Sequence, residues 1–282
     1  MGLRSGHIYM IVAVVFFAVM NTAVKFLSHI PFYQVVFLRA LISGILCSLM
    51  MIKGKVSFKG HDKRMLFYRG LFGTMAMSLY IKSLQDLPLA SAVSILQMSP
   101  LFMLFVSGAL LKEKATSFQW VFFMLAFIGV LFIKGFDTDV EGGSIVVALT
   151  AAFLAGVSHT LIRKLKGSDH ELVIIFYFSL ISVVLMAYPA LSTWVNMSLQ
   201  DWGWAFIVGA TTQIAQVFLT KAYHREKIAN VSLLNYLGII FSVIIGISVF
   251  AETYTWINYM GMAVVFFGIY GNTLTSKKIL SK

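Results

Sequence analysis

Apolar stretches about as long as a membrane-spanning helix follow one another along almost the whole chain. A helix needs about 20 apolar residues to cross the hydrocarbon core of a bilayer. With 59% hydrophobic and 12% charged residues, this chain of 282 residues holds more apolar side chains than one water-soluble core can bury. The pattern therefore predicts an all-α polytopic membrane protein. Its ten expected spans are residues 6–27, 33–52, 64–83, 88–111, 117–134, 142–162, 171–190, 201–222, 227–250 and 255–274.

The basic residues fall mostly on one side of these ten spans. If the chain crosses the bilayer alternately, 17 Lys and Arg lie on one side and 3 on the other, with Arg39 and Arg69 inside spans. Cytoplasmic loops are enriched in Lys and Arg, so both termini are expected in the cytoplasm. The net charge of +11 is explained by loops facing an anionic leaflet, and no nucleic-acid partner is expected. Cys47 is the only cysteine, which excludes an intrachain disulfide, and no metal or cofactor is expected.

The sequence repeats itself weakly at one constant offset. Gly70 aligns with Gly209, Lys25 with Lys164, Glu113 with Glu252, and Gly129 with Gly268. Residues 1–139 and 140–282 would then be two repeats of five spans each. Because five is odd, the two repeats would enter the membrane in opposite directions. Inverted repeats are common in secondary transporters, where binding sites lie between the halves. The alternative is an old duplication that is kept only for packing.

Several short motifs recur in the order and spacing of a known family. They are Phe37-Leu38-Arg39-Ala40-Leu41, Tyr68-Arg69-Gly70, Leu87-Pro88-Leu89-Ala90-Ser91-Ala92, Ser99-Pro100-Leu101-Phe102 and Leu110-Leu111-Lys112-Glu113. Over essentially the whole chain, the pattern resembles the EamA-like branch of the drug/metabolite transporter superfamily. The resemblance implies a pseudo-symmetric bundle around a central cavity, in a bacterial plasma (inner) membrane, that moves metabolites by alternating access. One departure is that Gly238 and Ile239 stand where the repeat would place Ser99 and Pro100.

Polar side chains follow helical spacing on the faces of several spans and predict one cavity near the bilayer midplane. Buried polar groups in a membrane are costly unless they face protein or water. Small polar residues can also simply join helices through close packing, and this remains the alternative for several of them. The candidates for substrate binding are Asn21, Thr74, Tyr80, Gln97, His159, Gln213, Gln216, Asn235 and Tyr236.

A second group of residues is expected to shape or gate the bundle. It comprises Arg39, Arg69, Pro100, Glu113, Gly238 and Glu252. Arg39 lies near the outer face and Arg69 near the cytoplasmic face, where each could extend to the interface. Arg39 could instead pair with a substrate carboxylate or anchor a gate. Pro100 predicts a kink or a free backbone acceptor, and the two glutamates at span ends are expected to cap helices or pair with lysine.

No Asp or Glu is expected at the centre of a span. This argues against a carboxylate that couples transport to protons or attracts cationic drugs. A small neutral, zwitterionic or anionic amphipathic metabolite fits the amide, tyrosine and guanidinium groups better. An amino acid or related compound that is exported or exchanged is the first hypothesis. S-adenosylmethionine uptake is an alternative, and an intramembrane enzyme is a remote one because no nucleophile–base pair or metal cluster stands out. Both a monomer and a homodimer remain open.

Overall fold

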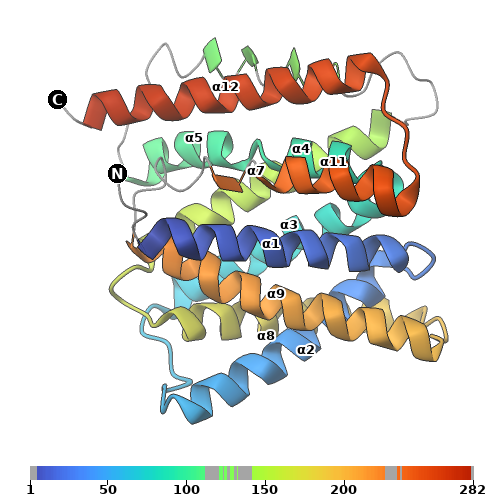
Figure 1. The fold of residues 1–282 in the computed structure, drawn as a ribbon. Helices are drawn as coiled ribbons and strands as arrows, with labels where there is room; N and C mark the ends of the chain where they lie inside the picture. Colours follow the sequence, from blue (N-terminus) through green and yellow to red (C-terminus); the bar gives the residue numbers. More distant parts are fainter. Residues whose placement is uncertain are drawn as a thin grey trace.

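All regular elements among the described residues are helices. The computed structural model describes residues 5–111, 121–122, 124–125, 128–129, 132, 142–225, 234–235 and 237–280. The helices are stacked in Figure 1, with α12 at the top, α1 near the middle and α2 at the bottom. They are α1 (Ser5–Phe26), α2 (Phe32–Lys53), α3 (Lys63–Asp86), α4 (Leu89–Leu96), α5 (Ser99–Leu111), α7 (Gly142–Lys164), α8 (Glu171–Ser192), α9 (Leu199–Arg225), α11 (Leu237–Phe250) and α12 (Trp256–Leu280).

Four helices of the described part are long and apolar enough to cross a membrane by length and composition: α1, α2, α7 and α8. Three shorter apolar helical stretches cover 89–103, 237–250 and 256–268. The expected single span 88–111 is wrong in one respect, since two helices, α4 and α5, occupy it. Most of the expected span 117–134, and residues 227–233, lie outside the described residues.

Large apolar side chains cover much of the outside of the bundle, and several polar side chains lie inside it. Large apolar side chains such as Val184 and Ile52 are 66% and 64% exposed on the outside of the bundle. Polar side chains such as Gln34, Thr74 and Thr212 are fully buried inside it. An apolar exterior is stable where the surroundings are lipid, whereas in water so much exposed apolar surface would promote association.

The offset between the two sequence repeats recurs in the helix bounds. Helix α2 begins at Phe32 and ends at Lys53, and α8 begins at Glu171 and ends at Ser192, so both ends are shifted by the offset that separates Gly70 from Gly209. The packing pairs follow the same relation. Helix α1 packs on α9 while α3 packs on α7, and α2 packs on α9 while α3 packs on α8. Helices α2 and α8 pack on each other. The chain therefore has a two-repeat architecture.

Two glycines at equivalent positions allow the repeats to approach closely. A Cβ on Gly70 would lie 2.3 Å from the Cδ1 atom of Ile181, and a Cβ on Gly209 would lie 2.5 Å from the Cβ atom of Ile42. Ile42 and Ile181 are themselves equivalent positions of the two repeats. Small residues at helix contacts are typical of membrane bundles, since they maximise backbone packing. These two contacts set the distances between α3 and α8 and between α9 and α2.

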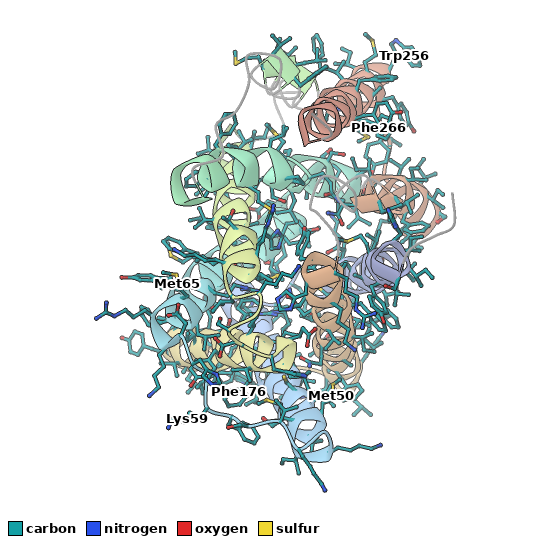
Figure 2. All side chains as sticks on the ribbon, turned by 90° about the vertical axis from the view of Figure 1, so that its left-hand side faces the viewer. Met50, Lys59, Met65, Phe176, Trp256 and Phe266 are labelled. Carbon is teal, nitrogen blue, oxygen red and sulfur yellow. The ribbon has the colours of Figure 1, made fainter. Side chains whose placement is uncertain are left out.

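Both ends of the described chain lie at one end of the bundle. Helix α1 begins, and α12 ends, on the left of Figure 1, where the connection between α2 and α3 also lies. Figure 2 looks onto this end and shows Lys59 of that connection. Trp256 and Phe266 lie on α12 at the upper edge in the same view, away from Met50, Met65 and Phe176.

Candidate functional site

A cavity of about 120 Å³ lies inside the bundle, between helices from both repeats. Residues of α1, α3, α4, α7, α8 and α9 line it, together with Ser99 at the start of α5 and Gly238 at the start of α11. The cavity brings together six of the expected binding residues: Asn21, Tyr80, Gln97, His159, Gln216 and Asn235. Residues from near the beginning of the chain and from its last quarter thus surround one space.

Two expected binding residues lie elsewhere, in contacts between helices. The hydroxyl of Thr74 lies 2.6 Å from that of Ser182 on α8. Gln213 Oε1 accepts a hydrogen bond of 2.7 Å from the hydroxyl of Ser43 on α2. Neither Thr74 nor Gln213 lines the cavity. Their placement corresponds to the packing alternative. Tyr236 and Glu113 lie outside the described residues.

A break between α4 and α5 lies at the cavity wall. Helix α4 ends at Leu96, α5 begins at Ser99, and Pro100 occupies the first turn of α5. Proline is well tolerated there because its missing N–H has no helical partner to lose. The expected kink is therefore a two-residue turn, Gln97 and Met98, between two separate helices. Gln97 sits in this interruption and donates a hydrogen bond of 2.7 Å from Nε2 to the carbonyl of Asn235.

The amide of Gln97 lies close to a position on the facing helix α11 that has no side chain, Gly238. A Cβ on Gly238 would lie 3.2 Å from Gln97 Nε2 and 3.7 Å from a methyl group of Val14. Gly238 thus leaves room for a polar link between the α4–α5 break and the start of α11. Sequence spacing indicated Gly238 only as the partner of Ser99, and both residues line the cavity.

Arg69 lines the cavity and does not extend to an interface. Its side chain is on a residue only 2% exposed, and its Cζ atom lies 4.3 Å from the ring centroid of Phe178. Arg39 is fully buried, with its Cζ atom 5.1 Å from the same centroid. The expectation that both side chains could extend to the membrane surface is therefore wrong. Helix periodicity gives the direction of a side chain, but burial also depends on the neighbouring helices.

Polar bonding around the two guanidinium groups is incomplete. Nη2 of Arg69 donates to Oε1 of Gln216 at 3.4 Å, but Nε and Nη1 of Arg69 have no hydrogen-bond partner among the described residues. Within the same part of the chain, the three guanidinium nitrogens of Arg39 have none either. No carboxylate of the described residues forms an ion pair with Arg39 or Arg69. A buried charge without a counter-charge is energetically costly.

Glu252 forms a polar cluster at the end of the bundle where α1 ends. Both of its carboxylate oxygens accept from the backbone N–H of Leu89, at 3.0 and 2.9 Å. Lys25 Nζ lies 3.2 Å from Oε1 and also donates to the carbonyl of Leu87 at 2.6 Å. The hydroxyl of Tyr254 donates to Glu252 and accepts from the N–H of Ala90. Glu252 thus caps the start of α4 and pairs with a lysine.

The cavity wall is symmetric in position but asymmetric in chemistry. Met77 and Gln216 are equivalent in the two repeats, and so are Tyr80 and Leu219, and both pairs line the cavity. In each pair one member is polar and the other apolar. Sequence reasoning missed Phe178, which packs against both arginines. Phe178 is the repeat equivalent of Arg39, so the alignment of the two halves held a signal for it.

Comparisons with known proteins also find transporters. The model of the EamA-like transporter family matches residues 4–135 and again residues 143–274. The pseudopaline exporter CntI of Pseudomonas aeruginosa is 30% identical over 246 residues, covering 85% of this chain and 86% of that protein. The S-adenosylmethionine uptake transporter of Rickettsia prowazekii is 23% identical, covering 78% of this chain and 75% of that protein.

Further similarities extend over nearly the whole chain. Solute carrier family 35 member G1 of mouse is 26% identical and covers 95% of this chain and 78% of that protein. A protein of known crystal structure shares 17% identity and superposes with a TM-score of 0.73, covering 98% of each chain. That likeness supports the fold. The two family matches, together with the relatives, show that this chain is a member of the EamA-like transporter family within the drug/metabolite transporter superfamily.

Proposed function

We propose that this chain is a secondary transporter that carries a small amphipathic metabolite across the bacterial plasma membrane by alternating access. The repeats 1–139 and 140–282 would form inverted halves with the cavity between them. The basic end of the bundle, with the α2–α3 connection and both termini, would face the cytoplasm. The Lys25–Glu252 cluster would then lie at the outer end.

The observation that carries this proposal is the chemistry of the cavity. Asn21, Gln97, Gln216 and Asn235 surround one space inside a bundle whose outside is apolar. Amide groups can donate and accept hydrogen bonds without a fixed charge, so they suit a solute that must be bound and then released. Most drug-sized ligand sites are concave and mainly apolar with a few such groups, which is the composition of this wall.

Export or exchange is the favoured direction because the relative at 30% identity is an exporter. Uptake of S-adenosylmethionine is the second candidate, favoured by the 23% identical uptake transporter. An intramembrane enzyme is the remote alternative. A metabolite that crosses the membrane chemically unchanged supports a carrier, and one that is converted supports an enzyme.

An efflux experiment tests the proposal. The purified full chain is reconstituted into liposomes loaded with a bacterial metabolite extract to which S-adenosylmethionine has been added, and mass spectrometry follows the compounds that leave. We expect at least one compound to leave unchanged and faster than from protein-free liposomes. Gly238→Leu should slow its exit because the new side chain enters the cavity next to Gln97 and Val14.

The matched control for this experiment is Gly203→Leu. No atom of the described residues lies within 4 Å of a Cβ added at Gly203, which is exposed on α9. This variant should transport like the unmodified protein. Equal transport by both leucine variants would place the path of the solute outside the cavity and contradict the proposal.

A further inference from the structure

Arg69 carries a positive charge in the cavity wall that no described group of the protein neutralises. In the part of the chain that the structure describes, its Nε and Nη1 atoms have no hydrogen-bond partner, although the residue is 2% exposed. None of the ion pairs among the described residues includes Arg69. Proteins generally pair a buried guanidinium with an anion or bury it with complete hydrogen bonding. The missing partner of Arg69 is therefore to be sought in the cavity that it lines.

The neighbours of Arg69 hold the guanidinium in place without satisfying it. The ring of Phe178 supports it at 4.3 Å, and Gln216 accepts from Nη2 at 3.4 Å. Gly73 lies one turn further along α3, and a Cβ there would stand 2.1 Å from Nη1. The absence of a side chain at Gly73 gives the guanidinium room to lie along the helix. A planar guanidinium held in this way presents parallel N–H donors, the arrangement that binds a carboxylate with two hydrogen bonds.

Two further features add to the attraction for an anion. Arg39 places a second positive charge by the same ring, within the same low-dielectric interior. Helix α11 also begins at the cavity, with Gly238 as its second residue. The start of a helix carries a partial positive charge and suits anionic groups.

The opposite end of the same cavity has a different character. Asn21 lines it and is 5% exposed, and no described residue forms a hydrogen bond with its Oδ1 atom. This atom can only accept, so it suits an N–H or O–H group of a ligand. Tyr80, which lines the cavity as well, is two helical turns beyond Gly73 on α3, and a helix rises about 1.5 Å per residue. The guanidinium of Arg69 lies beside Gly73, so this group and Tyr80 mark two levels of the cavity roughly 10 Å apart along α3.

We infer that the cavity binds its substrate through a carboxylate, which pairs with Arg69 between Gln216 and Phe178, while the apolar middle of the cavity holds the rest of the molecule. The inference rests on the proposed carrier function and narrows it to amphipathic monocarboxylates that carry a hydrogen-bond donor. The positive charge of Arg69 repels cations. Neutral analogues bind more weakly than the acids because they lack the carboxylate that pairs with Arg69. Gly73 acts as a positioning residue, since it decides where the guanidinium lies.

The test compares carboxylic acids with their own primary amides. The purified full chain is mixed with N-benzoylglycine, N-acetylleucine or N-acetylphenylalanine, or with the primary amide of each, and the shift in Tm gives an apparent Kd. We expect the acids to raise Tm and to bind at least about tenfold more tightly than the amides, as one charge-assisted pair would give. Arg69→Gln should abolish this preference. Arg64→Gln, which removes the same charge at an exposed position, should preserve it.

A second variant keeps the test decisive if Arg69→Gln fails to fold. Gly73→Ala retains the arginine but places a methyl group where Nη1 lies, so it should reduce the preference for acids several-fold. Gly203→Ala is its control. Acids and amides that bind equally, no stabilisation by any acid, or a preference that persists in Arg69→Gln and Gly73→Ala would each overturn the inference. A compound found in the efflux experiment whose transport is unaffected by Arg69→Gln would also overturn the inference, while leaving the carrier function intact.

Discussion

Replacing Glu252 with glutamine should destabilise the end of the bundle where α1, α4 and the connection from α11 to α12 meet. The carboxylate contacts the N–H of Leu89 through both oxygens and lies 3.2 Å from Lys25 Nζ. The side chains of Lys25 and Glu252 are 17% and 12% exposed, so water screens this pair only in part. Glutamine retains an acceptor for Leu89 but loses the charge.

The expected loss follows from the number of contacts to the charged group. A hydrogen bond to a charged group contributes about 1.5–3 kcal/mol. An anion at the start of a helix adds about 0.3–1 kcal/mol. Glutamine retains part of the bonding to Leu89, so we expect Glu252→Gln to reduce the free energy of unfolding by roughly 2 kcal/mol. A change of that size corresponds to a factor of about 30 in an equilibrium constant.

Unfolding of the purified protein in mixed micelles measures this loss. Asp86→Asn is the control, because it breaks the Lys82–Asp86 pair, whose lysine is 42% exposed. An exposed pair of this kind contributes about 0–1 kcal/mol. A double-mutant cycle of Glu252→Gln with Lys25→Met should yield a coupling energy of about 1 kcal/mol or more. Equal losses in Glu252→Gln and Asp86→Asn, together with zero coupling, would refute the reasoning.

Further expectations concern packing and buried polar contacts, all measured as changes in unfolding free energy. Gly209→Ala should cost about 1–3 kcal/mol through overpacking, and more than Gly70→Ala, because the atom it meets is a Cβ and not the mobile end of a side chain. Gly203→Ala should be neutral or stabilising, since alanine favours a helix by about 1 kcal/mol, and a cost as large as that of Gly209→Ala would contradict this. Gln213→Leu should cost about 1–3 kcal/mol by leaving the Ser43 hydroxyl without its acceptor; adding Ser43→Ala should recover part of the loss, and no recovery would count against the contact.

Much of the fold could be predicted because apolar length and charge act locally along the chain. The expected span 33–52 differs from α2, Phe32–Lys53, by one residue at each end. The offset between the sequence repeats recurs in the helix bounds and in the packing pairs. The break at Gln97 could not be predicted, because apolar residues continue on both sides of it over a total length that suits one span. Only Pro100 indicated that the backbone is irregular there.

The site was harder to predict because spacing gives the face of a helix but not its neighbour. Gln213 and Gln216 are three residues apart on α9 and share one broad face. Nevertheless Gln213 contacts α2 and Gln216 lines the cavity. The burial of Arg69 could not be predicted for the same reason, because its guanidinium packs against Phe178 on another helix, α8. The binding roles of the residues that line the cavity stay predictions.

Access of water to the cavity from either side of the membrane is the central claim. It is tested most directly with Asn235→Cys in a chain whose only native cysteine, the buried Cys47, is replaced by alanine. A small membrane-impermeant thiol reagent is applied to right-side-out and to inside-out vesicles. Alternating access predicts labelling from both sides and protection by the substrate, while Ala148→Cys, in the packed core, stays unlabelled. A cysteine at position 235 that is inert from both sides, or labelled from one side only under all conditions, would contradict the account.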